Sequence, residues 1–285
     1  MRERFKIIYL LFLPLSFSFA QLNPGARQIS IANSDVALSN DVLSIYSNPA
    51  GIAQLNWREV GMFYSPAPFG LKELANGFIA YHEPFKLFNI SLGAMTYGFD
   101  LYKENKISLC IAKNFSNNLF AGLMTNLHSL SIKNYGSDVS FTFDLGLLTY
   151  LTDDIRFGFC YKNFTRSTFG DYKNQIPTLF SAGISYSPLE NSNINVATEK
   201  DIELPMSLRL GFEYLFLNYV AVRTGFSSEP EKFTFGIGII YSFLEVDYAI
   251  FNHQDLGFTH QVGILLSFSE NKSRQTKIKE YLEIK

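Results

Sequence analysis

The sequence predicts an all-β fold, an antiparallel transmembrane β-barrel of about fourteen strands with an N-terminal hatch or plug segment. Three observations lead to this prediction. Aromatic residues make up 16% of the chain, with 28 Phe and 16 Tyr but 1 Trp. Long segments alternate between apolar and small polar residues with the period of a strand. After residue 20, no apolar run reaches the length of about 18 residues that a membrane helix needs.

The first twenty residues have the features of a signal peptide. A basic stretch, Arg2–Lys6, precedes an apolar run over Ile7–Phe19 that is too short to span a bilayer as a helix. Small residues at Ser18 and Ala20 predict cleavage after Ala20. An exported chain of this composition is either a secreted β-sandwich or an outer-membrane barrel.

The alternation favours the barrel. From Lys232 to Phe243, every second residue is a large apolar one, and those between are mainly Gly, Ser or Thr. The pattern recurs over 205–217 and 139–151. These segments run for about 10–13 residues, longer than the about 5–6 of globular strands and close to the about 9–11 of a tilted membrane strand. A soluble sandwich would instead carry many charges on its solvent face.

The predicted strands are even in number, as single-chain bacterial barrels require. They are 56–65, 75–83, 87–97, 105–113, 118–132, 138–151, 154–164, 177–187, 192–201, 205–217, 219–228, 232–243, 244–252 and 258–268. The odd-numbered connections are longer on average, and the longest are expected near 66–74 and 165–176. Since such barrels have long outer loops and short periplasmic turns, both termini are predicted to be periplasmic and the barrel to lie in the bacterial outer membrane.

The chain is therefore expected to have four parts. Residues 1–20 are the signal peptide, 21–55 the hatch segment, 56–268 the barrel and 269–285 a polar periplasmic tail. Apolar residues such as Ile278 have the spacing of a short amphipathic helix in this tail, but a frayed terminus is the behaviour expected of a chain end.

The hatch segment lacks the strand period. Ser39, Asn40 and Asp41 are predicted to cap a short helix through 42–46. The motif Asn48, Pro49, Ala50 and Gly51 would stop this helix, because Pro and Gly are helix breakers. The segment would lie in the periplasm or fold back into the lumen as a plug.

Two parts of the sequence resemble a known family. Gly25–Arg27, Asp35–Asp41 and Ile45–Ala53 are similar to the N-terminal segment of PorV/PorQ-type proteins, and Val246–Ala249 with Asp255–Gln261 is similar to their C-terminal pattern. The Asn-Pro-Ala-Gly segment also occurs across the wider FadL-like superfamily of outer-membrane barrels. The resemblance implies a fourteen-stranded barrel with an N-terminal hatch.

The resemblance leaves two functions open. One is a secretion-associated role of the type IX kind, with secretion-system proteins as partners, and the C-terminal pattern favours it slightly. The other is a FadL-like channel for uptake of a small hydrophobic ligand, which requires a gap in the wall, such as near Pro84 or Gly93. A purely structural barrel is a third interpretation. Each of them would contact outer-membrane lipid.

No catalytic residue, metal site or cofactor is predicted, and the chain is not expected to be an enzyme. The 4 His lack metal-site spacing, the 2 Cys form no disulfide framework, and no nucleophile-elbow pattern occurs. With 24 Lys+Arg against 26 Asp+Glu, the chain also lacks the basic excess that nucleic acid binding requires.

Charged residues within the strands are predicted to point into the lumen, because a charge facing lipid costs about 2–4 kcal/mol near the midplane. Arg209 and Arg223 lie on adjacent predicted strands, and Glu213 and Asp247 are expected to pair with them. Such a network either lines a polar path for a ligand or fills the barrel and holds the hatch, and the second interpretation is favoured. The complete predicted set is Asp144, Arg156, Lys162, Arg209, Glu213, Arg223, Glu245 and Asp247.

Overall fold

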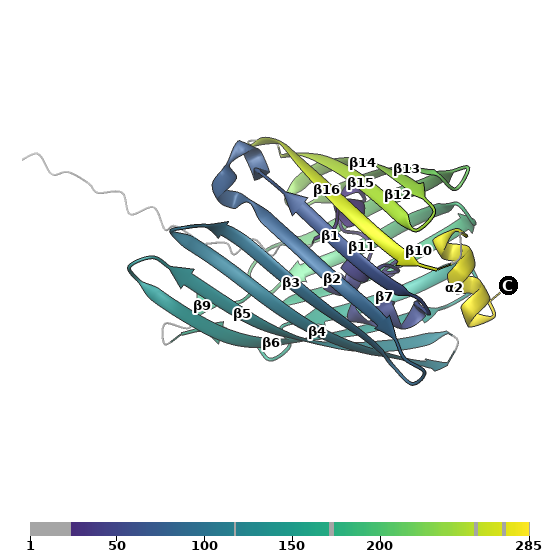
Figure 1. Ribbon diagram of the computed structural model, residues 1–285, viewed down its shortest axis with the longest axis horizontal. Coiled ribbons are helices and arrows are strands. Elements are labelled where there is room, and N and C mark those ends of the chain that lie inside the picture. Colours follow the sequence, from purple (N-terminus) through teal and green to yellow (C-terminus); the bar gives the residue numbers. More distant parts are fainter. Residues whose placement is uncertain (1–23, 117, 171–173, 254–255, 270–271, 285) are drawn as a thin grey trace, which may run out of the picture.

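Fourteen antiparallel strands close into one barrel, which confirms the predicted fold class (Figure 1). The computed structural model describes residues 24–116, 118–170, 174–253, 256–269 and 272–284. The predicted signal peptide, 1–20, lies outside these residues. Consecutive strands pair around the barrel, and β1 pairs with β16 to close it. Among the described residues, no helix is long and apolar enough to cross a membrane.

Each barrel strand lies within a few residues of its predicted segment. The strands are β1 (Arg58–Ser65), β2 (Asn76–Pro84), β3 (Asn89–Phe99), β4 (Tyr102–Ser116), β5 (Leu119–Ile132), β6 (Gly136–Tyr150), β7 (Ile155–Lys162), β10 (Leu179–Leu189), β11 (Ser192–Asp201), β12 (Met206–Phe216), β13 (Val220–Ser228), β14 (Glu231–Tyr241), β15 (Leu244–His253) and β16 (Gly257–Phe268). The agreement follows because a shift of one residue would turn the apolar face of a strand inward.

The two longest connections lie at the same end of the barrel, as predicted. Residues 66–75 contain the short helices η3 (Pro68–Gly70) and η4 (Lys72–Leu74), and 163–178 contain the small hairpin of β8 (Thr168–Phe169) and β9 (Asn174–Gln175). We name this the loop end, and the opposite end, where β1 begins, the α2 end. The other odd-numbered connections are about as short as the even ones, so the difference in length comes from two loops.

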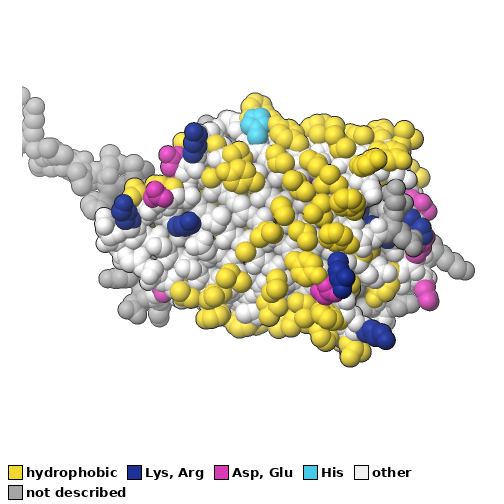
Figure 2. Space-filling view, in the orientation of Figure 1, with side chains coloured by type: hydrophobic (Ala, Val, Ile, Leu, Met, Phe, Trp, Pro, Cys, Tyr) yellow, Lys and Arg dark blue, Asp and Glu magenta, His cyan; other side chains and the backbone are white. Residues whose placement is uncertain are grey.

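The outer wall carries a broad apolar belt. On β4, Ile107, Leu109 and Ile111 face outward and are bounded by the exposed Lys103 and Lys113. Figure 2 shows hydrophobic side chains gathered over the middle of the barrel and toward the α2 end, with a polar surface at the loop end. A closed barrel with such an outer surface is suited to lipid, because exposed apolar patches of this extent are rare on soluble monomers.

The segment 24–57, which we name the N-terminal segment, lies inside the barrel. Its helix α1 (Ala26–Ser30) contacts β13–β16, whereas η2 (Pro49–Gln54) contacts β3–β6. Between them, η1 (Val42–Tyr46) contacts β1 and β2. Of residues 24–55, all but Asn33 are buried. The segment therefore spans the lumen from one side of the wall to the other.

Inward-facing glycines leave room for the N-terminal segment. A Cβ at Gly122 on β5 would overlap the Pro49 carbonyl, and one at Gly146 on β6 would overlap the Asn48 side chain. A backbone that approaches a strand this closely requires glycine there. The small-residue face that predicted a barrel thus accommodates the N-terminal segment.

The Asn-Pro-Ala-Gly motif does more than end a helix. As predicted, Asp41 caps η1, and its side chain accepts from the Ser44 backbone N–H at 2.9 Å. The motif follows η1, but it also begins η2, with the Asn48 side chain accepting from the Ala50 N–H at 3.1 Å. Proline is favoured at the first position of a helix because its fixed φ suits the helix and its missing N–H would be unpaired there.

A helix, α2 (Arg274–Leu282), follows β16 where a frayed terminus was expected. The Ser273 side chain accepts from the Thr276 N–H at its N-terminus. Ile278 and Leu282, four residues apart, are both buried. The structure differs from the expectation because this apolar stripe packs on the end of the lumen, and packing of one face is what stabilises short helices.

Candidate functional site

The candidate site is the filled lumen, and its ionic centre is Arg223 on β13. The Arg223 side chain is 2% exposed and meets three carboxylates. It pairs with Glu213 on β12 and with Asp247 and Glu245 on β15, the last at 2.9 Å. A buried guanidinium is tolerated only when its donors are paired in this way.

Arg27 on α1 ties the N-terminal segment to this centre. Its guanidinium donates to both carboxylate oxygens of Glu213, at 2.8 and 2.9 Å, and to Asn40 and Asp41 within its own segment. Burial alone would lower the pKa of Arg27, but the Glu213 and Asp41 carboxylates outweigh burial and raise that pKa well above its ordinary value. Arg27 is therefore a fixed positive charge that joins segment and wall.

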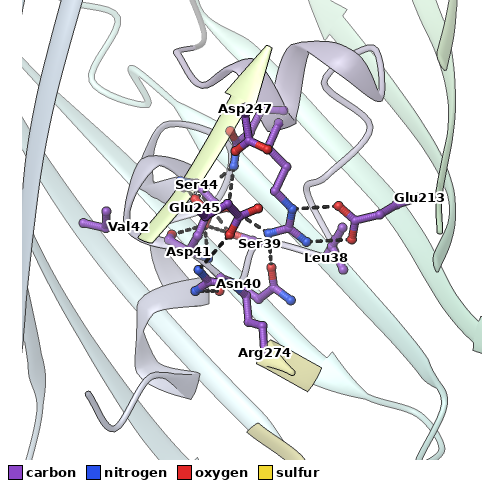
Figure 3. A network of polar contacts seen from close by, with 12 residues as sticks. Leu38, Ser39, Asn40, Asp41, Val42, Ser44, Glu213, Glu245, Asp247 and Arg274 are labelled. Carbon is purple, nitrogen blue, oxygen red and sulfur yellow. Dashed lines mark hydrogen bonds and ion pairs between the residues drawn. The ribbon is translucent and has the colours of Figure 1, made fainter. Parts of the chain in front are cut away.

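A third arginine, Arg274 on α2, completes the cluster from the α2 end. It donates to the Glu59 carboxylate on β1 at 2.7 Å and to the Asn40 carbonyl at 3.0 Å. Trp57 Nε1 donates to the same carboxylate at 2.8 Å. Figure 3 shows Glu213, Glu245 and Arg274 converging from separate elements beside the turn at Asp41. Three parts of the chain thus meet in one network.

The predicted lumen charges all face inward, but they do not form a single group. Arg223 meets Glu213 and Asp247, as expected. Arg209, by contrast, pairs with Glu199 on β11. Arg209 lies four residues before Glu213 on β12, about 13 Å along a strand, so it reaches a different partner.

Arg156 is linked to the arginine cluster through Asn193, whose amide donates to Glu213 at 3.0 Å. Arg156 donates to Ser185, Ser187 and Asn193 at 3.1–3.2 Å. Asp144 accepts from the Asn126 side chain at 2.9 Å.

Four members of the arginine cluster were missed by the sequence analysis: Arg27, Asp41, Glu59 and Arg274. Arg27, Asp41 and Arg274 lie outside the strands, where alternation cannot assign a facing direction. Glu59 lies near the start of a predicted strand and was not singled out. Arg27 and Asp41 do stand in segments that carry the family resemblance, and that signal could have identified them.

The hatch motif lies on the other side of the lumen, where the contacts are apolar. Ile52 and Ala53 of η2 belong to one buried cluster with Phe120, Met124 and Leu148 of the wall. The motif adds few polar contacts, and the main ones come from the Asn48 side-chain amide. This amide donates to the Val36 carbonyl at 2.8 Å and to the Leu147 carbonyl on β6 at 2.9 Å. Motif and wall are therefore joined mainly by close packing.

A cavity of about 180 Å³ lies at the α2 end. Its lining includes the paired Arg27 and Glu213, the first turn of α2, and the apolar residues Leu217, Tyr219 and Phe243 at strand ends. Leu217 is 87% exposed, so this rim reaches the outer surface of the barrel. Within the described part of the chain, His, Cys, Asp and Glu side chains form no group of three that could hold a metal ion.

The wall is interrupted beside β6. β7 pairs only with Leu145–Tyr150 of β6, so among the described residues no strand pairs with the same edge over 136–144. Residues after β7 cover part of this edge, with the Phe164 N–H donating to the Phe143 carbonyl at 3.0 Å. The expected gap near Pro84 or Gly93 is absent, because both residues are paired with neighbouring strands.

Apolar side chains lie on both faces of the unpaired edge. On the outside, Val139 and Phe141 are each 56% exposed. On the inside, Leu130, Phe169 and Ile176 form a buried cluster. The inward-facing residues of β6 itself, Ser140, Thr142 and Asp144, are polar, so the apolar surface on the inside comes from this cluster.

Solved structures of outer-membrane barrels share this fold. The Pseudomonas putida toluene transporter TodX aligns with a TM-score of 0.61 at 13% identity, covering 80% of this chain and 93% of that one. A TodX monoaromatic hydrocarbon channel mutant, deltaS2, aligns with a TM-score of 0.67 at 12% identity, covering 90% and 100%. A Pseudomonas aeruginosa FadL homologue aligns with a TM-score of 0.60 at 12% identity, covering 86% and 97%. At these identities the likeness concerns the fold.

No protein-family model and no curated protein matches the chain. The shared fold agrees with the broader FadL-like part of the sequence resemblance. The PorV/PorQ-type resemblance stays a prediction.

Proposed function

We propose that the chain is an outer-membrane channel for the uptake of small hydrophobic molecules. The observation that carries this proposal is the unpaired edge of β6, with exposed apolar side chains outside and a buried apolar cluster beside it inside. A molecule held in the apolar belt could move around this edge and meet the buried cluster of Leu130, Phe169 and Ile176 on the inside. The similar fold of TodX, described as a toluene transporter, supports the same function.

In this proposal the N-terminal segment acts as the hatch and the α2 end faces the periplasm. The two longest connections lie at the loop end, and in outer-membrane barrels long loops face outward. Both ends of the barrel strand series then lie on the periplasmic side. The N-terminal segment fills the lumen between the β6 edge and the α2 end, so a passing molecule requires it to move.

The secretion-associated role of the PorV/PorQ type remains a proposal that rests on the sequence resemblance. It predicts a protein partner that co-purifies in fixed ratio with the barrel. A purification from native membranes therefore separates the two functions, since uptake predicts a bound hydrophobic molecule instead.

The decisive experiment closes the β6 edge. Phe143→Cys with Phe164→Cys would join neighbouring residues whose rings lie 6.2 Å apart between centroids. The matched control is Leu147→Cys with Phe159→Cys, a pair in the continuous part of the wall. Entry of the apolar fluorophore N-phenyl-1-naphthylamine is followed in Gram-negative cells that express each barrel.

We expect the unmodified barrel to speed entry, the first disulfide to slow it, and a reducing agent to restore it. The control disulfide should change nothing. Unchanged entry with the closed edge, in cells whose outer membrane contains the barrel, would contradict the proposed route. No effect of the unmodified barrel would contradict uptake itself.

A further inference from the structure

We propose that α2 is a gate that bridges the mouth of the barrel at the α2 end. It must leave before the N-terminal segment can move toward that end. This inference goes beyond the proposed uptake, because it concerns which part of the chain opens the lumen and not what passes through it.

α2 contacts opposite sides of the wall. Arg274 pairs with Glu59 on β1 at 2.7 Å. One residue later, the Gln275 amide donates to Ser187 on β10 at 2.8 Å and to Asn193 on β11 at 2.6 Å. In the barrel order, β1 is separated from β10 and β11 by several strands in either direction. The helix therefore crosses the mouth and does not merely lie along its rim (Figure 1).

α2 also covers the N-terminal segment. Ile278 and Leu282 are 2% and 1% exposed and belong to the same buried cluster as Ile52 of η2. The Lys277 ammonium lies 4.5 Å from the centroid of the Trp57 ring, and Arg274 binds the Asn40 carbonyl. The segment cannot shift toward the α2 end while the helix occupies this position.

The mouth has the charge that favours a basic helix. The wall and the N-terminal segment supply two guanidinium groups here, those of Arg27 and Arg223. The buried carboxylates outnumber them by three and are those of Asp41, Glu59, Glu213, Glu245 and Asp247. Arg274 supplies a third guanidinium to this acidic mouth. A buried carboxylate without a partner is costly, so the Arg274–Glu59 pair holds the helix in place.

The test compares full-length protein in lipid vesicles with α2 pinned or loosened. Gln275→Cys with Asn193→Cys, joined by a short bis-thiosulfonate, pins the helix reversibly, and the native Cys110 and Cys160 are buried. Arg274→Gln loosens it. Arg58→Gln is the matched control, because it removes an exposed arginine that pairs with Glu83.

Hydrogen exchange of the backbone amides over Ala26–Gln54 is the main readout. The only tryptophan, Trp57, reports release of α2 through its emission wavelength. We expect pinning to slow this exchange, a reducing agent to restore it, and Arg274→Gln to speed it by on the order of tenfold with a red shift of Trp57 emission. The Arg58→Gln protein should behave as the unmodified one.

Equal exchange over Ala26–Gln54 in the pinned and reduced protein would overturn the proposal. A change confined to α2 would also overturn it. The pinned and reduced states are compared within one protein, so the result does not depend on whether Arg274→Gln folds. Because no cargo is used, failure of the gate and failure of the uptake proposal give different results.

Discussion

The two sides of the lumen hold the N-terminal segment by different means. Toward β12–β16, the segment is joined to the wall through Arg27 and the carboxylates around Arg223. Toward β3–β6, the same segment is held by Ile52 and its apolar neighbours. Glycines that allow close approach of the segment occur in the wall on both sides. We name these the ionic side and the apolar side.

The difference indicates separate roles for the two sides. An ionic cluster depends on geometry, because each charge must find its partner, and so it fixes where the segment sits. Apolar packing is less directional and mainly contributes burial. We therefore expect the ionic side to respond sharply to the loss of one charge, and the apolar side to respond in proportion to lost volume.

The largest effect is expected from Arg223→Met. Methionine replaces the long unbranched side chain of arginine with an apolar one. Glu213, Glu245 and Asp247 are then left without their shared partner. Removing one member of a buried ionic cluster typically costs about 3–5 kcal/mol. Urea unfolding of the reconstituted protein, followed by Trp57 emission, measures the loss. A free energy of unfolding equal to that of the exposed-site variant Arg58→Gln would show that the ionic side is dispensable.

On the apolar side, Ile52→Ala should have the next largest effect. Ile52 is fully buried, and truncation of a buried isoleucine to alanine costs about 2–5 kcal/mol, depending on how far the site collapses. The same unfolding measurement applies. Ile52→Val is the graded control and should cost about 0.5–1.5 kcal/mol. If the valine and alanine variants lost equal stability, the response would not follow volume and the comparison would fail.

Gly122→Ala tests close approach without removing any group. The added Cβ would overlap the Pro49 carbonyl, so η2 must move off the wall by a small distance. Overpacking of this kind costs about 1–3 kcal/mol. The barrel strands should remain paired, while proteolysis within 49–54 becomes faster. Gly77→Ala serves as the control, because a Cβ there meets only ordinary contacts. Equal proteolysis of both variants would argue against tight docking of η2.

Much of the fold could be predicted because the alternation within each barrel strand shows which residues face the lumen and which face outward. Alternation placed Arg223 and Glu213 inside the lumen, and neighbouring strands brought them together. The partner of Arg209 could not be predicted in this way. Facing direction says nothing about depth along the barrel. The register places Ala197 opposite Arg209, and Glu199, two residues further along β11, reaches Arg209 diagonally.

The elements outside the strands were harder to predict. α1 and η2 have no period-two pattern, so their contacts are set by the shape of the lumen that the strands create. The sequence feature that indicates the position of η2 is in the wall, where Gly122 and Gly146 face inward opposite the motif. A frayed terminus was expected in place of α2. Ile278 and Leu282 stabilise a helix only when they have the mouth of the barrel to pack against, and the sequence does not show that mouth.

α2 is the element that touches both sides, with Arg274 on the ionic side and Ile278 on the apolar side. Its Lys277 gives the smallest predicted effect. Desolvation lowers the pKa of Lys277 to about 8, assisted by the positive charge of Arg274 and opposed by Glu59 and Glu245. In the released helix the pKa would return to its ordinary value of 10.5.

The direction of the pH effect follows from these two values. Between pH 8 and 10.5 the docked helix binds fewer protons than the released one, so raising the pH through this window favours docking. Below about pH 8 the ammonium is charged in both states, and the cost of burying it no longer changes. Docking of α2 should therefore strengthen from pH 8 to 10.5. The measurement uses the Arg274→Gln protein, in which we expect α2 to be released in a fraction of the molecules. Stronger docking is then seen as a blue shift of Trp57 emission. Adding Lys277→Met should abolish the shift. If the shift persisted with methionine, another group would govern docking, and α2 would be held by its apolar face and Arg274 alone.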